Sequence, residues 1–129
     1  MSTAEASVTD LNSPMDGEHR VQVGLINALC EAIESGKPAE DTDRILDQLV
    51  DYCRAHFMSE ELLMRLDSYE GFESHVEDHA QMIDALDGMV AARHAGDSPL
   101  IPGQARNLLG FLVRHIETKD AQYARSPKL

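Results

Sequence analysis

Residues 45–64, ILDQLVDYCRAHFMSEELLM, carry the pattern that decides the fold. Apolar side chains recur at steps of three and four, which is the period of a helix that buries one face. His56 and Glu60 continue this apolar stripe one helical turn apart, so we expect both to point toward the core. The segment therefore predicts an amphipathic helix that brings two polar groups into the interior.

Start and stop signals on either side of this segment predict three further helices. Ser13-Pro14 begins the first helix, Gly36 ends it, and Pro38 precedes the quoted one. Residues 67–71 interrupt the pattern before a third helix, and Pro102 opens a fourth. Four helices with short connections, and no alternating strand pattern, predict an all-α fold: an up-down-up-down antiparallel four-helix bundle.

The bundle is expected to span residues 13–125, between a loose N-terminal arm (1–12) and a C-terminal tail (126–129). The net charge of −12, without a cluster of Lys and Arg, argues against nucleic acid or an anionic membrane as partner. The first residues lack the pattern of a signal peptide, so a cytoplasmic location is expected. Cys30 and Cys53 lie on apolar stripes and are expected to pack in the core as reduced thiols.

Seven residues fall at helical spacings that can surround two metal ions. They are His19, His56, Glu60, His75, His79, His115 and Asp120. One such pair is weak evidence, but three pairs on three helices and a histidine on the fourth are harder to explain otherwise. Buried polar groups are costly unless something satisfies them, and a metal does so. Periodicity alone leaves either Lys119 or Asp120 on the inner side of the last helix, and His94, without a partner, is expected to be exposed.

The number of candidate ligands limits the chemistry. Neutral imidazole suits iron, zinc and copper, and carboxylates can bridge two ions. If Glu60 and Asp120 both bridge, together with a solvent hydroxide, the five candidate histidines divide as three and two. One ion is then coordinatively closed and the other has a single vacancy. Such a site accepts one small diatomic ligand and has little room for a second substrate.

Four motifs contain these residues: Met15-Asp16-Gly17-Glu18-His19 with Asn27, His56-Phe57-x-x-Glu60-Glu61-x-x-Met64, His75-x-x-x-His79, and His115-Ile116-x-x-x-Asp120. Together they resemble the motifs of the hemerythrins, specifically the stand-alone bacteriohemerythrins, over about residues 15–123. Myohemerythrin, a member of the same family, is itself an up-down-up-down four-helix bundle. The resemblance implies a non-haem di-iron centre that binds dioxygen reversibly.

The resemblance also implies a role for each ligand. His75, His79 and His115 would bind the closed iron, His19 and His56 the open one, and Glu60 and Asp120 would bridge the two ions. Apolar residues would line the ligand pocket and keep water out, with ordinary core packing as the alternative role for each of them. By spacing, the candidates for this lining are Phe57, Leu63, Leu112 and Ile116.

The chain departs from many bacterial relatives in two places. It contains no tryptophan, and Phe111 stands where those relatives carry a tryptophan on the fourth helix. The arm before the first helix also lacks the usual apolar pattern. These differences concern how well the pocket is sealed, and they leave the seven candidate ligands in place.

Three functions remain open at this point. We favour a binding protein and not an enzyme: reversible dioxygen binding for carriage, storage or sensing. Nitric oxide, other small diatomic molecules and small anions are further candidate ligands. The alternative is a di-iron oxidoreductase acting on peroxide, nitric oxide or ferrous iron. Five histidines against two carboxylates argue against it, because anionic ligands stabilise oxidised iron better. The third is a bundle that holds zinc or no metal.

Overall fold

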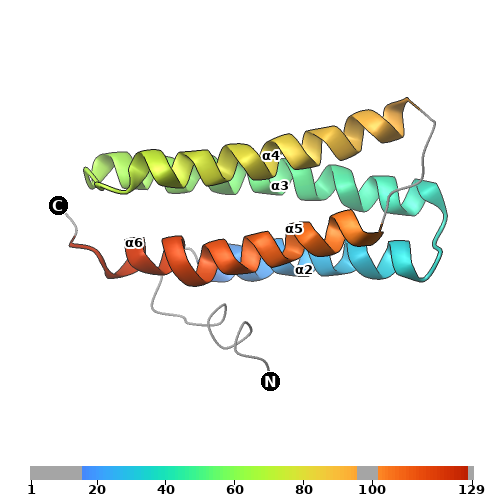
Figure 1. The fold of residues 1–129 in the computed structure, drawn as a ribbon, viewed down its shortest axis with the longest axis horizontal. Coiled ribbons are helices and arrows are strands. Elements are labelled where there is room, and N and C mark those ends of the chain that lie inside the picture. Colours follow the sequence, from blue (N-terminus) through green and yellow to red (C-terminus); the bar gives the residue numbers. More distant parts are fainter. Residues whose placement is uncertain (1–15, 96–101, 128–129) are drawn as a thin grey trace, which may run out of the picture.

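The computed structural model describes residues 16–95 and 102–127, and the regular structure within these ranges is helical. The helices are α2 (Asp16–Glu34), α3 (Ala39–Leu66), α4 (Phe72–His94), α5 (Pro102–His115), the π-helical turn η1 (Ile116–Asp120) and α6 (Ala121–Arg125). Because α5, η1 and α6 follow one another without a break, they form one rod (Figure 1). The predicted start at Ser13-Pro14 and the predicted arm lie outside the described residues.

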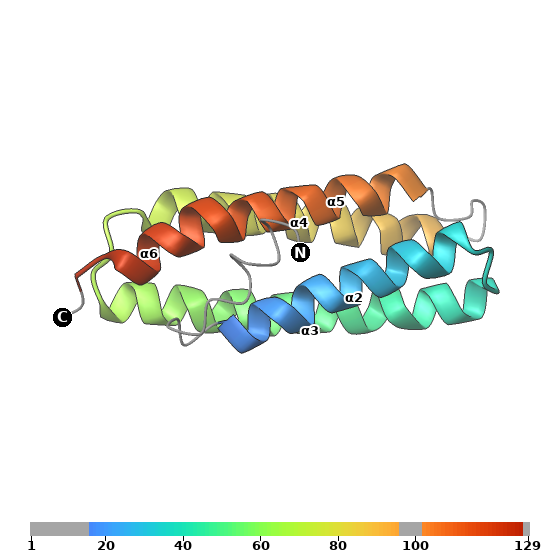
Figure 2. The same ribbon diagram turned by 90° about the horizontal axis from the view of Figure 1, so that it is seen from below.

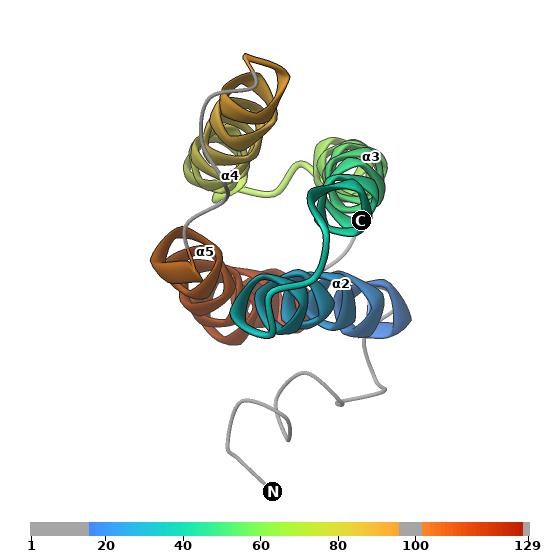
Figure 3. The same cartoon turned by 90° about the vertical axis from the view of Figure 1, so that its right-hand side faces the viewer.

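The rods run up, down, up and down, as predicted, and lie side by side in a bundle (Figures 1 and 2). Seen along the bundle, α2 packs against α3 and α5, and α3 packs against α4 (Figure 3). The contact between α4 and α5 is less extensive, since α4 diverges toward its C-terminal end (Figure 1). A groove of about 490 Å³ lies between them, with Met82, Leu108 and Phe111 among its lining residues.

Gly36 ends α2, as the sequence predicts. Its φ of 73° lies in the left-handed region, which glycine adopts without steric cost. The Lys37 N–H donates to the carbonyl of Ala32 at 2.9 Å, and the Gly36 N–H donates to that of Ile33 at 3.2 Å. This pair of bonds is a Schellman motif, which satisfies carbonyls that the helix end would otherwise leave unpaired.

The end of α3 uses the same motif without a glycine. Ser68 adopts a φ of 52°. Its N–H donates to the carbonyl of Arg65 at 3.1 Å, and the Tyr69 N–H donates to that of Met64 at 3.0 Å. The chain therefore turns into α4 through a strained residue, because a side chain in this conformation meets the following carbonyl.

The core is apolar away from one end of the bundle. It is built mainly from Ile26, Leu29, Leu46, Leu49, Cys53, Leu86, Leu108 and Leu112. Cys30 and Cys53 are buried free thiols, as expected. On α2, Val23 is only half-buried and Gln22 takes the fully buried position instead. Steps of three and four counted from His19 run through Val23 and Ile26 and so favour valine in the core, but the structure buries the neighbouring amide instead.

Ion pairs join the rods at their surfaces. Arg106 of α5 pairs with Glu34 of α2 at 2.7 Å, and Arg54 of α3 pairs with Asp87 of α4 at 2.7 Å. Exposed pairs of this kind contribute little stability each, so they mainly favour the correct neighbours. None of the helices in the described ranges combines the length and the apolar character that crossing a membrane requires.

Candidate metal centre

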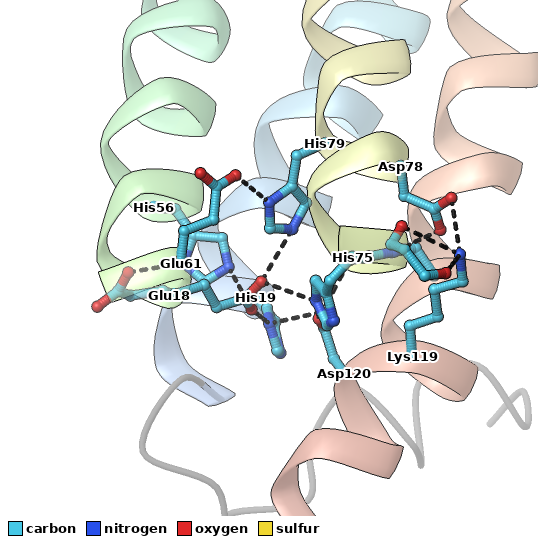
Figure 4. Close-up of polar contacts among 12 residues, drawn as sticks. Glu18, His19, His56, Glu61, His75, Asp78, His79, Lys119 and Asp120 are labelled. Atoms are coloured by element: carbon cyan, nitrogen blue, oxygen red, sulfur yellow. Dashed lines mark hydrogen bonds and ion pairs between the residues drawn. The ribbon is translucent and has the colours of Figure 1, made fainter. Parts of the chain in front are cut away.

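All seven predicted site residues are buried, and the fold brings them together at the end of the bundle where α3 turns into α4 (Figure 4). His19 comes from α2, His56 and Glu60 from α3, His75 and His79 from α4, His115 from α5, and Asp120 from η1. His94 is exposed at the far end of α4, as expected.

The π-helical turn decides that Asp120 faces inward. In an α-helix, residues five apart differ by about 140° in direction, so His115 and Asp120 would not share a face. In η1, the Ala121 N–H donates to the carbonyl of Ile116, five residues earlier, and such wider turns place residues five apart on one side. Lys119 points away and donates to Asp78 at 3.0 Å. The structure thus resolves the alternative between Lys119 and Asp120.

Glu60 lies between four histidines and uses its two oxygens on different ones. Its Oε2 is 3.0 Å from Nε2 of His19 and 3.2 Å from Nε2 of His56. Its Oε1 is 3.2 Å from Nε2 of His75 and 3.0 Å from Nε2 of His79. A carboxylate that bridges two ions needs this division of its oxygens.

Asp120 divides its oxygens in the same way. Its Oδ1 is 2.6 Å from Nε2 of His75 and 3.1 Å from Nε2 of His115, and its Oδ2 is 3.0 Å from Nε2 of His19. Two overlapping groups of possible ligand atoms result, each with its atoms within 4.8 Å of one another. The first group contains Glu60, His75, His79, His115 and Asp120, and the second contains His19, His56 and Glu60.

Three of the histidines are oriented by a carboxylate from a neighbouring helix. Because an ionised carboxylate only accepts, each Nδ1 must carry a hydrogen and donate it, which fixes the tautomer. The three contacts are His56 Nδ1 to Glu18 at 2.7 Å, His79 Nδ1 to Glu61 at 2.8 Å, and His115 Nδ1 to Asp78 at 2.9 Å.

The Nε2 atoms of these three rings are available as metal ligands. Nε2 of His56, His79 and His115 is buried and has no hydrogen-bond partner among the described residues. With Nδ1 protonated, each Nε2 presents a lone pair, and the carboxylate oxygens opposite are acceptors too. Acceptors that converge without donors are satisfied by a cation. The donor set of imidazole nitrogens and carboxylate oxygens fits iron, as well as zinc.

Without metal, protons take the place of the cation on the rings whose pKa is raised, which are those of His19, His56 and His75. Burial lowers the pKa of His19, but hydrogen bonds and charge from Asp120 and Glu60 outweigh it and raise the pKa to about 9. The same balance raises the pKa of His75 to about 9. Burial raises the pKa of Glu60, but its histidine neighbours hold it well below the usual range. The cluster is therefore an ion-pair network when metal is absent.

Glu18, Glu61 and Asp78 contact candidate ligands, and the sequence pattern assigned them no role. A signal was present: each lies next to a predicted site residue in the chain, whereas its histidine partner lies on a different helix. Residues adjacent in a helix diverge by about 100°, so an acidic neighbour of a ligand can reach across to another helix. Lys119 supports this arrangement by pairing with Asp78.

The candidate lining residues occupy different environments. Phe57 is buried and stacks on the His79 ring, with the ring centroids 3.9 Å apart and the planes 10° from parallel. Leu112 and Ile116 are buried, and Leu63 is half-buried. Phe57 thus holds a ring of the centre in place, and the pocket-lining role of the four residues stays a prediction.

Fold and site together define a class of protein: four-helix bundles that hold a histidine-rich, carboxylate-linked cluster suited to two metal ions between their helices. The family model described as "Hemerythrin HHE cation binding domain" matches residues 10–125. The chain belongs to the hemerythrin family.

Curated relatives and solved structures agree with this assignment. The chain is 29% identical to the bacteriohemerythrin of Methylococcus capsulatus over 108 residues, which cover 84% of this chain and 82% of that protein. It is 30% identical to the bacteriohemerythrin of Pseudomonas paraeruginosa over 118 residues, covering 88% and 75% respectively. A crystal structure of wild-type hemerythrin superposes with a TM-score of 0.81 at 27% identity, covering 88% of this chain and 87% of that one.

Proposed function

We propose that this protein holds two non-haem iron ions and binds dioxygen reversibly at one of them. In this assignment His75, His79 and His115 bind one iron, and His19 and His56 bind the other. Glu60 and Asp120 bridge the two, together with a solvent oxo or hydroxo group. Hemerythrins bind dioxygen at a di-iron site, and the chain belongs to that family.

The observation that carries the proposal is the unequal division of five imidazole nitrogens around two shared carboxylates. Glu60 presents Oε2 to His19 and His56 and Oε1 to His75 and His79. Oδ1 of Asp120 adds His115 to the second group, which then has three histidines against two. An ion bound by two histidines has one fewer protein ligand than its neighbour, so it is the ion with room for an external ligand. When bound, the iron pair supplies the two electrons that reversible dioxygen binding uses.

The surrounding residues favour binding over turnover. The carboxylates of Glu18, Glu61 and Asp78 accept from the Nδ1 atoms and leave each Nε2 free for metal. Phe57 stacks on the ring of His79 and covers one face of it. A closed, histidine-rich site that admits one small ligand suits carriage or storage of that ligand.

The test is an anaerobic optical experiment on the iron-loaded protein. We expect the reduced protein to be nearly colourless, to gain visible absorption when air is admitted, and to lose it when oxygen is withdrawn. Irreversible oxidation on first exposure would favour the di-iron oxidoreductase instead. A protein that shows no iron-dependent colour would point to another metal, and the proposal would then be wrong.

A further inference from the structure

A layer of four side chains forms the part of the core that adjoins the metal centre. Each lies three residues from a histidine of the centre, on its core side: Gln22 after His19, Cys53 before His56, Met82 after His79 and Leu112 before His115. None of the four is more than 1% exposed. Because three residues make nearly one helical turn, this layer bounds the centre on the side of the core.

One half of the layer is polar and the other half is apolar. On the α4 and α5 side it consists of Met82 and Leu112. On the α2 and α3 side, Nε2 of Gln22 donates to Sγ of Cys53 at 3.3 Å. The amide oxygen of the same side chain, Oε1 of Gln22, is buried and has no hydrogen-bond partner within the described ranges. A buried amide oxygen without a partner is unusual, and it fits a ligand that supplies the missing hydrogen bond.

The polar half lies over the histidines that the proposed function assigns to the open iron. Gln22 follows His19 on α2, and Cys53 precedes His56 on α3. Gln22 and Cys53 therefore adjoin the half of the centre to which the proposed function assigns the vacant position. The apolar half adjoins the histidines assigned to the closed iron, where no external ligand is expected.

Because the thiol of Cys53 can both accept and donate a hydrogen bond, the amide of Gln22 can turn either its oxygen or its NH₂ group toward a ligand. Burial raises the pKa of the Cys53 thiol to about 11, so the thiol keeps its hydrogen at neutral pH. It can accept from Nε2 of Gln22, as here, which leaves Oε1 free to accept from a ligand. It can also donate to Oε1 once the amide has turned over, which leaves the NH₂ group free to donate to an anion.

We propose that Gln22 determines ligand specificity: its amide, anchored by Cys53, hydrogen-bonds the free end of the small ligand that enters the vacant position beside His19 and His56. This inference rests on the proposed function. The ligands it favours are small molecules and anions whose free end forms a hydrogen bond with the amide once they are bound.

Azide binding to the oxidised, iron-loaded protein tests the inference. Gln22→Leu replaces the amide by an apolar side chain of similar size. We expect the azide Kd to rise about tenfold, as for one lost hydrogen bond. The antisymmetric stretch of bound azide in the infrared, which reports on hydrogen bonding, should shift as well. Gln81→Leu, an exposed glutamine on α4, is the matched control and should change neither quantity.

Two variants of Cys53 test the anchor. Cys53→Ser keeps a group that can accept and donate, so the azide Kd should stay close to that of the unaltered protein. Cys53→Ala removes the partner of the amide and should weaken azide binding. If Gln22→Leu does not fold, this pair decides: equal azide affinity in the serine and alanine variants would overturn the inference.

The same measurements separate this inference from the proposed function. Two iron ions per chain, with unchanged azide affinity and infrared stretch in Gln22→Leu, would overturn the role of Gln22 and leave the proposed function intact. Failure of the unaltered protein to take up iron would overturn the proposed function and this inference with it.

Discussion

At the scale of single residues, Glu60 and Asp120 each contact histidines of both metal groups. Replacing either with alanine removes ligand oxygens from two ions at once and leaves buried imidazoles without a partner. We expect the iron content of Glu60→Ala, and of Asp120→Ala, to fall below two ions per chain, as measured by elemental analysis of the purified protein.

Two substitutions serve as controls for this loss. His94→Ala and Glu73→Ala change exposed groups on α4 and should leave the iron content and optical spectrum unchanged. Full retention of both ions by Glu60→Ala and Asp120→Ala would show that neither carboxylate bridges. Loss of iron from His94→Ala would show that the assigned ligand set is wrong.

Glu61 orients His79 from α3 without being a candidate ligand itself. Glu61→Gln keeps the shape of the side chain but removes the charge that fixes the Nδ1 hydrogen. We expect metal affinity to fall about 10- to 100-fold, as for other outer carboxylates, in competition with a chelator. Glu77→Gln, at an exposed position of α4, is the matched control. Equal affinities in the two variants would mean that the contact has no role in metal binding.

The sequence predicted six of the seven cluster residues because they continue stripes that follow the helix period, whereas Asp120 was chosen over Lys119 only by the resemblance of His115-Ile116-x-x-x-Asp120 to a hemerythrin motif. The sequence could not predict the contacts of Glu18, Glu61 or Asp78. An acidic residue next to the buried face of a helix is normally solvent-exposed, and only the position of the neighbouring helix shows that it reaches a histidine there. The burial of Gln22 could not be predicted for a related reason. The helical period favours Val23 as the buried residue, and only the packing of the helices shows that Gln22 is buried instead.

At the scale of helices, the end of α3 stores strain in Ser68. Glycine adopts a φ near 52° without the steric cost that serine incurs there. We expect Ser68→Gly to raise the free energy of unfolding by about 0.5–1 kcal/mol, measured by urea titration. Gly36→Ala introduces the opposite change at φ 73° and should lower it. Destabilisation by Ser68→Gly would mean that the serine side chain contributes more than its conformation costs.

The π-helical turn leads us to predict how two single-residue deletions affect metal binding. Removing the exposed Thr118 shortens the spacing from His115 to Asp120 to four residues, at which an ordinary α-helix keeps both on one face. We therefore expect the deletion to retain metal. Removing the exposed Gly110 from α5 instead rotates everything beyond it by about 100°, and metal should be lost. Iron content of the two deletion variants is the measurement, and equal loss in both would contradict the account.

Helix boundaries were predictable where glycine or proline marks them, as at Gly36, Pro38 and Pro102. The wider turn in the last helix was not, because residues 116–120 contain nothing that forbids an α-helix. What selects the turn is the placement of Asp120 in the cluster and of Lys119 against Asp78, and both depend on contacts with other helices.

At the scale of the whole molecule, the metal-free bundle should have a pH optimum. His19 and His75 have pKa values raised from 6.5 to about 9, so their stabilisation is complete below about pH 6.5 and disappears as the pH rises through 9. The lowered pKa of Glu60 gives stabilisation that is present above its usual value of 4.5 and is lost in acid. The optimum therefore lies between these limits.

The measurement is urea unfolding of chelator-treated protein across this range. We expect the free energy of unfolding to fall by about 3–7 kcal/mol between pH 6.5 and pH 10, because each raised pKa corresponds to about 3 kcal/mol and the two histidines share the same carboxylates. The iron-loaded protein should not lose stability in this way, because metal replaces the protons on the rings, and it should lose metal in acid instead. A flat profile for the metal-free protein would contradict the ion-pair network, and His94→Ala provides the control.

The wide separation of the cluster along the chain has a consequence for biosynthesis. His19 lies near the start of α2 and Asp120 at the end of η1, so a growing polypeptide contains the first candidate ligand long before the last. A nascent chain that has emerged only as far as α4 lacks both His115 and Asp120. Under the proposed di-iron assignment, the complete ligand set exists only after translation has passed η1, and a fragment that ends before α5 would lack two of the seven ligands.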